Sequence, residues 1–131
     1  MLINFRKNPS AIPYLFRIDG MGVERVTEYK YLGTVLDNKL NFNANTNFIH
    51  KKCLPRVFCL QKMRSLDVNV AVLHTLFRSC IESVLTFLFL CWFGGLSVKS
   101  KNVLNKVVNV CGKTAGKKQK TLSELYKCCV V

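Results

Sequence analysis

The basic side chains are the residues of this sequence whose number and spacing could do chemistry, and that chemistry is the binding of polyanions. The chain carries twenty Lys and Arg against seven Asp and Glu, which is a formal net charge of +13. Between Asp37 and Asp67 there are six basic residues and no acid, and from Lys99 to Lys127 there are eight basic residues and one acid, Glu124. Such an excess attracts nucleic acid or an anionic membrane surface. The plainer alternative is a solubilising surface without a specific partner.

The acidic residues, by contrast, lack the spacing that polymerase chemistry requires. Nucleotide transfer by two metal ions needs paired carboxylates that hold Mg²⁺ against the incoming triphosphate. The seven acids are scattered singly and no two are adjacent. The sequence therefore predicts no catalytic residue in this chain.

The Cys and His residues do not form a recognisable metal or redox motif either. There are seven Cys and two His, with no C-x-x-C pair. His50 and Cys53 could both bind a metal, but no second pair completes a four-ligand site. We expect no metal and no cofactor. The first nine residues lack the apolar segment of a signal peptide, so we expect an intracellular protein, nuclear or cytoplasmic, whose cysteines are reduced and mostly act as small packing residues.

The N-terminal part is expected to form a small antiparallel sheet within residues 2–36. Turn residues at Asp19–Gly22 predict a hairpin, and Gly33 indicates a bulge or a close backbone approach inside the last strand. The expected strands span 2–5, 14–18, 23–27 and 29–36.

Three helices are expected to follow as a thumb-like bundle, so the predicted class is α+β. The first starts at Asn43 and should bend near residues 51–55, because Pro55 removes a backbone donor. The second should run from an N-cap at Asp67 to Phe93, and the third from about Ser97 to Cys111. The predicted regions are 1–40 (strands), 41–112 (helices) and 113–131 (a basic tail).

Helical periodicity predicts which side chains these helices bury. The expected apolar arc of the first helix is Ile49, Cys53, Leu54, Val57, Phe58 and Leu60, with Lys51, Lys52, Arg56 and Lys62 opposite. The third helix should bury Val103, Leu104, Val107, Val108 and Cys111 and expose a stripe of Lys99, Lys106 and Lys113. The run Val84–Phe93 is apolar on all sides and should be buried. It is too short for a bilayer core, which needs roughly twenty apolar residues, so no membrane span is expected.

Several strings in a fixed order resemble the end of the palm, the primer grip and the thumb of LINE-type (non-LTR) retrotransposon reverse transcriptases. Tyr29–Gly33 is similar to the (F/Y)K(F/Y)LG motif of the primer grip, and Phe77–Thr86 to the family's FYR-x-x-IESILT helix. Pro55 and the very apolar Phe87–Cys91 depart from the family pattern. The other matching strings are Ile3–Lys7, Ile18–Gly20, Val23–Val26, Asn45–Asn47, Lys51-Lys52, Leu60–Arg64, Trp92–Gly94, Leu104–Val108 and Leu122–Tyr126.

The resemblance implies a C-terminal piece of an RNA-directed DNA polymerase, whose catalytic (Y/F)-x-D-D motif would precede Met1. Such a piece would bind primer and template without sequence preference, and an upstream palm domain would be a second partner. Tyr29–Gly33 would line the primer end, and basic helix residues would contact phosphates. The candidate nucleic-acid-binding residues are Tyr29, Lys30, Tyr31, Leu32, Gly33, Lys51, Lys52, Arg56, Lys62, Arg64, Lys99, Lys106 and Lys113.

The N-terminal stretch also resembles the segment family named after the N-terminus of AlkB-type alkylation-repair homologues. That resemblance implies a 2-oxoglutarate- and iron-dependent oxygenase, with methyltransferase activity by association. Iron binding would need an H-x-(D/E) pair, but His50 is followed by Lys51-Lys52 and His74 by Thr75-Leu76. The alternatives to a binding module are therefore this enzyme class and a structural remnant without function.

Overall fold

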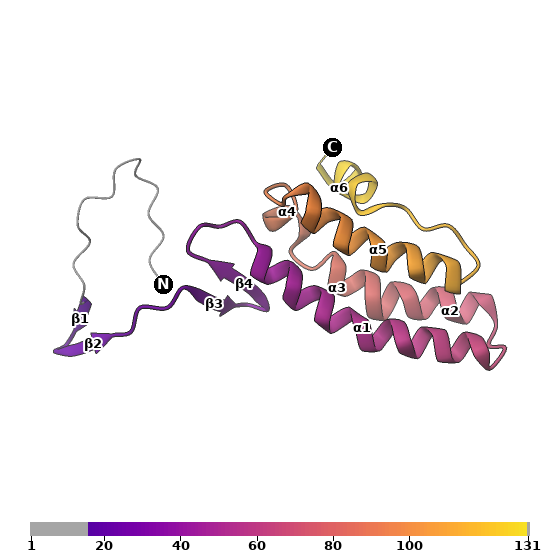
Figure 1. Cartoon of the computed structure of the whole chain (residues 1–131), viewed down its shortest axis with the longest axis horizontal. Coiled ribbons are helices and arrows are strands. Elements are labelled where there is room, and N and C mark those ends of the chain that lie inside the picture. The colour runs from indigo at the N-terminus through magenta and orange to yellow at the C-terminus, as the bar shows by residue number, and fades with distance from the viewer. Residues whose placement is uncertain (1–15, 131) are drawn as a thin grey trace.

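The computed structural model describes residues 16–130, which form two β-hairpins followed by a helical bundle (Figure 1). This arrangement confirms the predicted α+β class. The expected strand at 2–5 lies outside the described residues. The strands are β1 (Phe16–Ile18), β2 (Met21–Val23), β3 (Glu28–Tyr31) and β4 (Thr34–Asp37). The helices are α1 (Asn43–Ser65), α2 (Val70–Leu76), the π-helix η1 (Phe77–Glu82), α3 (Ser83–Leu85), α4 (Phe89–Trp92), α5 (Val98–Thr114) and α6 (Leu122–Val130).

Both hairpins reverse on a two-residue turn that ends in glycine. β1 pairs antiparallel with β2 across Asp19 and Gly20, whose φ angles are 49° and 79°. β3 pairs with β4 across Leu32 and Gly33, with φ angles of 46° and 83°. Positive φ at both central positions is the requirement of the tight hairpin turns that match the twist of the strands.

The prediction of one strand over residues 29–36 is therefore wrong. The string is β-prone on both sides of Gly33, so its pattern resembles one strand, but the glycine permits a reversal in place of the expected bulge. Tyr31 lies opposite Thr34 and Glu28 opposite Asp37 in the resulting ladder. The four described strands consequently form two separate two-stranded sheets rather than one small sheet.

Helix α1 begins at Asn43, as predicted, and continues through Pro55 to Ser65. Ile49, Cys53, Val57 and Leu60 of the predicted apolar arc are buried. Leu54 and Phe58 were also expected on that arc, but their side chains are 51% and 61% exposed. The contact of α1 with its neighbours is narrower than its apolar face, so these two residues lie beyond its edge.

The second predicted helix, 67–93, is broken into shorter elements. Asp67 has a φ of 54° in the turn before α2, and Asn69 caps that helix by accepting a hydrogen bond from the Ala71 N–H at 2.8 Å. The chain leaves the helix after α3, and Leu88, with a φ of 49°, precedes α4. The indole Nε1 of Trp92 donates to the Phe87 carbonyl at 2.8 Å, which satisfies an acceptor that the break releases.

The break changes which residues of this apolar run are buried. Leu85, Phe89, Trp92 and Phe93 are buried, in agreement with the expectation. Phe87, Leu88 and Leu90 are between 44% and 54% exposed, so the prediction that the whole run is buried is wrong. The helix ends after α3, and this end turns Phe87, Leu88 and Leu90 toward solvent. The apolar pattern of the run contains no signal that marks the end of the helix.

Helix α5 matches its prediction most closely. Ser97 caps it by accepting from the Ser100 N–H at 3.2 Å, and Leu104, Val107, Val108 and Cys111 are buried. The expected Val103 is only half-buried, while the stripe of Lys99, Lys106 and Lys113 is exposed.

Helix α6 starts with a reciprocal cap between Thr121 and Glu124. The Thr121 N–H donates to Glu124 Oε2 at 2.8 Å, and the Glu124 N–H donates to Thr121 Oγ1 at 3.3 Å. The helix packs against α4 and α5, and the ring of Tyr126 lies 5.7 Å from Phe89 and 5.3 Å from Phe93 between centroids. The C-terminal segment therefore folds back onto the bundle.

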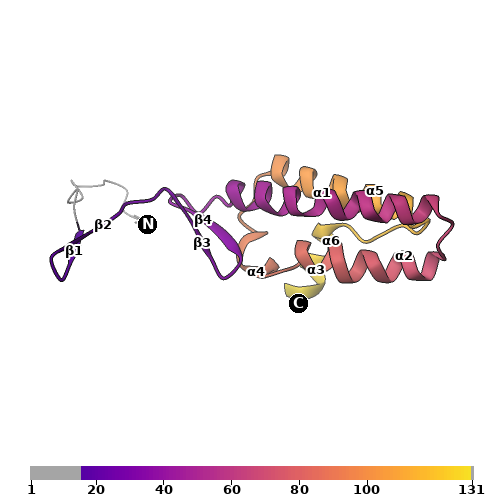
Figure 2. The ribbon, with the colours of Figure 1, turned by 90° about the horizontal axis from the view of Figure 1, so that it is seen from below.

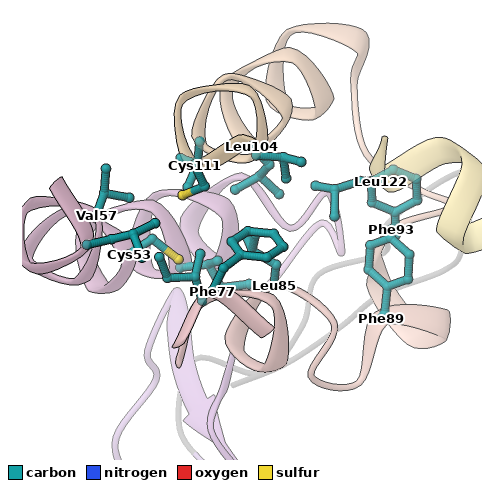
Figure 3. Close-up of a cluster of buried hydrophobic side chains, with 14 of the residues drawn as sticks. Cys53, Val57, Phe77, Leu85, Phe89, Phe93, Leu104, Cys111 and Leu122 are labelled. Atoms are coloured by element: carbon teal, nitrogen blue, oxygen red, sulfur yellow. The ribbon is translucent and has the colours of Figure 1, made fainter. Parts of the chain in front are cut away.

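One apolar core joins α1, the α2–η1–α3 run, α5 and α6. Figure 3 shows Cys53 and Val57 of α1 facing Phe77, Leu85, Leu104 and Cys111 from the other helices, with Leu122 beside them. In Figure 2, α1 and α5 form one layer and α2 and α3 lie against it. Only Cys53 and Cys111 of the seven cysteines are buried, so the expectation that most cysteines act as packing residues is wrong.

Candidate nucleic-acid interface

The β3–β4 hairpin, helix α1 and the α3–α4 junction meet around an open cavity of about 330 Å³. The hairpin contributes Gly33 of its reversal and Thr34, and α1 contributes residues of its first three helical turns. The α3–α4 junction contributes the exposed ring of Phe87. This volume is at the lower end of the roughly 300–1,000 Å³ typical of ligand pockets. The cavity is lined by Gly33, Thr34, Asn45, Phe48, Ile49, Lys52, Ser83, Val84 and Phe87.

Asp37, at the end of β4, fixes the hairpin relative to α1. Its carboxylate accepts backbone N–H bonds from Lys39 (2.9 Å), Asn41 (3.1 Å) and Phe42 (2.9 Å). The Asp37 side chain is buried, although it is an acid. These bonds turn the chain from the hairpin into α1 and set the position of one cavity wall relative to the other.

Asn45 is the second tie between the hairpin and α1. Its side chain is 1% exposed, and its Oδ1 accepts the Val35 N–H at 3.1 Å. Because Val35 offers a donor, the amide oxygen must face the strand, and the Nδ2 amide faces elsewhere. Within residues 16–130, this Nδ2 is the one buried side-chain nitrogen or oxygen atom without a hydrogen-bond partner.

Phe48 gathers two ammonium groups beside the cavity. The Nζ of Lys30 lies 4.9 Å from the centroid of its ring, and the Nζ of Lys52 lies 5.9 Å from it. Both distances are within the range of a cation–π contact. Lys30 comes from β3 and Lys52 from α1, so the ring brings together charges that are distant in sequence.

Gly33, in the β3–β4 turn, and Phe87, between α3 and α4, lie against each other at one side of the cavity. A Cβ atom on Gly33 would lie 3.2 Å from Cε1 of Phe87, so only glycine permits this spacing without a shift. The expectation of a close backbone approach at Gly33 is thereby confirmed. The Phe87 ring is 51% exposed, so one part of it remains open to solvent.

The structure brings three of the residues predicted to bind nucleic acid to this cavity, namely Lys30, Gly33 and Lys52. Tyr29, Tyr31 and Leu32 of the same hairpin are between 55% and 71% exposed. Tyr29 and Tyr31 lie two residues apart on β3, so they share one face of the strand while Lys30 points to the other.

Arg56 has a different environment from the other basic residues of α1. Its Nη1 donates to the backbone carbonyl of Cys80 in η1, and its side chain is half-buried. The guanidinium therefore links two helices of the bundle. Any phosphate contact must use its remaining donors.

The remaining predicted residues lie on exposed surfaces of α1 and α5. Lys51 and Lys62 lie on the side of α1 away from the core. The Nζ of Lys62 lies 5.8 Å from the centroid of the exposed Phe58 ring. Arg64 lies in the last turn of α1. The stripe of Lys99, Lys106 and Lys113 is on α5 and does not line the cavity.

A second basic surface was missed by the sequence reasoning. It surrounds a hollow of about 340 Å³ between the α2–η1 run and the segment before α6. Its basic residues are His74, Arg78, Lys117, Lys118 and Lys120. The lysine-rich segment is evident in the sequence, but nothing local indicates that it faces Arg78, some forty residues earlier in the chain.

Few of the positive charges are neutralised within the described part of the chain. Residues 16–130 contain one ion pair, between Arg78 Nε and Glu82 Oε2 at 3.4 Å. Hydrogen bonds from Thr121 hold the pKa of Glu124 below its usual value, so this acid serves mainly as a helix cap. Most Lys and Arg side chains thus have no acidic partner among the described residues.

Comparison with protein-family models, with curated proteins and with solved structures gives no match. In the described part of the chain, no three His, Cys, Asp or Glu side chains are grouped so that they could hold a metal ion. No helix between residues 16 and 130 combines the length and apolarity needed to cross a membrane.

Proposed function

We propose that the chain is a nucleic-acid-binding module that acts as the primer grip and thumb of a LINE-type reverse transcriptase. The observation that carries the binding part of this proposal is the unpaired positive charge: eighteen of the twenty Lys and Arg lie within residues 16–130, and the same residues contain one ion pair. Basic side chains without acidic partners are free to neutralise phosphates and release counterions, which drives binding without sequence preference.

The β3–β4 hairpin supports the same function through its aromatic residues. Tyr29 and Tyr31 present exposed rings on one face of β3, and Lys30 lies on the other face beside Lys52. Bases stack on exposed rings and phosphates meet ammonium groups, so the two faces of β3 offer the two kinds of contact that a nucleic-acid strand makes. The exposed Leu88 and Leu90, which do not line the cavity, are candidate contacts for an adjoining palm domain.

The module should bind without polymerising. The chain has no adjacent acidic pair to hold two Mg²⁺ ions, so primer extension should stay at the level of a control without protein. Mg²⁺-dependent incorporation by the purified chain would contradict the proposal that this chain only binds.

A salt titration of binding to a fluorescent single-stranded oligonucleotide tests the proposal. Each phosphate contact should contribute about −0.7 to the slope of log K against log salt concentration. The double variant Lys51→Gln/Lys62→Gln removes two exposed charges from α1 and should flatten the slope by roughly 1.4, which is two such contacts. The variant Arg17→Gln/Arg25→Gln removes the same charge from the first hairpin and its following segment, and should leave the slope nearly unchanged.

The outcomes distinguish the alternatives. An equal change in both variants would show that net charge alone matters, rather than the α1 surface. Absence of binding even at low salt would favour a structural remnant. Binding to anionic vesicles in preference to the oligonucleotide would assign the charge to a membrane surface.

A further inference from the structure

We propose that the cavity between the β3–β4 hairpin, α1 and the α3–α4 junction receives one unpaired base of a bound nucleic-acid strand. This inference rests on the proposed function and adds a specific subsite to it. Phosphate binding by the exposed basic residues of α1 and α5 needs no cavity. The cavity would therefore have no role if the strand were bound through its sugar–phosphate backbone alone.

The first observation is the unused donor of Asn45. Its Oδ1 is held by the Val35 N–H, and its Nδ2 has no partner although the side chain is 1% exposed. A buried donor without an acceptor is costly. The Nδ2 atom is closed to solvent, so an acceptor on a base reaches it only with a shift of the surrounding side chains, and the bond then gained competes with no bond inside the protein. Asn45 lines the cavity. Ring nitrogens and carbonyl oxygens of the nucleobases are acceptors of this kind.

The second observation is the arrangement of rings and charges around the same space. Phe87 lines the cavity and leaves half of its surface exposed, as a stacking platform for a base would. Phe48 lines it too and holds the ammonium groups of Lys30 and Lys52 at its ring. A base against Phe87 would carry its own phosphate, and Lys52, which lines the same cavity, offers an ammonium group to meet it.

The third observation is that the cavity depends on glycine at position 33. A side chain at this position would press on Phe87, since even a Cβ would lie 3.2 Å from its ring. The Phe87 ring would then have to move, and the space would change. The sequence at the tip of the hairpin is thus suited to keeping the cavity open.

The test compares two single-stranded twelve-nucleotide probes with the same number of phosphates, one with bases and one abasic throughout. The wild-type chain should bind the probe with bases at least about five-fold more tightly, because stacking on Phe87 adds to stacking on Tyr29 and Tyr31. Phe87→Ala should lower this ratio about five-fold or more, which is the contribution of stacking on one aromatic side chain, and stacking on Tyr29 and Tyr31 should account for what remains. Leu54→Ala, which deletes an apolar side chain that is also 51% exposed and lies outside the cavity, should preserve it.

A probe with 5-iodouracil gives an independent readout of the same contact. Photo-crosslinks should map to Phe48 or Phe87, and should be lost with Phe87→Ala if that ring is the platform. Equal affinity for both probes, or a ratio unchanged by Phe87→Ala, would overturn the base subsite while leaving phosphate binding intact. Crosslinks confined to Tyr29 and Tyr31 would also overturn it, and failure of both probes to bind would overturn the proposed function as well.

Discussion

The two hairpins of this chain are alike in local geometry and differ in everything that surrounds them. Each reverses on a two-residue turn with positive φ that ends in glycine. The described side chains of β1–β2 are all exposed, and Figures 1 and 2 show this hairpin lying apart from the bundle. The β3–β4 hairpin is tied to α1 by Asp37 and Asn45 and lines a cavity. A hairpin becomes part of a site when buried polar groups tie it to a helix, because two strands alone are marginally stable.

Hydrogen exchange should give the largest difference between the hairpins. The Val35 amide, which is bonded to the buried Asn45, should exchange only on opening of the bundle, with protection worth about 3 kcal/mol or more. Amides of β1–β2 should exchange close to the rate of an unstructured peptide. Similar protection in both hairpins would show that the first is also anchored.

Loss of the Asp37 carboxylate should give the next largest effect. Asp37→Ala removes the acceptor of three backbone N–H groups and should lower the free energy of unfolding by about 2–4 kcal/mol, given the strength of hydrogen bonds to charged groups. Denaturant titration measures this loss. Asp19→Asn, in the exposed turn of the first hairpin, is the control: it removes a carboxylate charge, keeps a residue that tolerates the positive φ, and should cost less than about 0.5 kcal/mol. Equal losses would mean that Asp37 does not anchor its hairpin.

The two turn glycines should differ by a smaller amount. Gly20→Ala and Gly33→Ala both force alanine into a positive φ, but only Gly33→Ala also presses on Phe87. We expect Gly33→Ala to cost about 1–2 kcal/mol in unfolding free energy and Gly20→Ala about 1 kcal/mol or less. In a Phe87→Ala background the two substitutions should become more alike. An excess cost that persists there would place the strain elsewhere than at Phe87.

Alkaline pH should act on the bundle rather than on the first hairpin. Burial raises the pKa of the Cys111 thiol from 9.0 to about 11, with a further contribution from nearby Cys53. Between these values the unfolded chain loses a proton that the folded chain keeps, so stability should fall as the pH rises through this window.

Thermal unfolding between pH 8 and 11 measures this fall. Cys111→Ala should weaken the pH dependence, whereas Cys59→Ala, at an exposed position, should leave it unchanged. If both variants retain the full slope, groups other than the buried thiol are responsible.

Several features of the molecule were predictable because they depend on residues close together in the chain. The α+β class, the first hairpin and the buried face of α5 follow from turn residues and from helical periodicity. The charge excess follows from composition alone. Each of these signals is complete within a few turns of chain.

The predictions that were wrong concern features that depend on residues far apart in the chain. The reversal at Gly33, the end of the second helix near Thr86 and the exposure of Leu54 and Phe58 all depend on what a segment packs against. An apolar run has the same pattern whether it continues as a helix or stops, and the Phe89–Trp92 turn is decided by its partners in α6.

The candidate site shows the same division. Residue types in the sequence determined that the chain is basic, that it lacks paired acids and that Lys52 is a candidate for binding, and the resemblance to the (F/Y)K(F/Y)LG motif added Tyr29–Gly33. Only the tertiary structure decided that the ammonium groups of Lys30 and Lys52 both lie at the ring of Phe48. It also decided that Arg56 donates a hydrogen bond to the Cys80 carbonyl and that the Nδ2 of Asn45 has no acceptor. These facts depend on the distance between atoms on different elements, and that distance is set by packing of the core rather than by local preference.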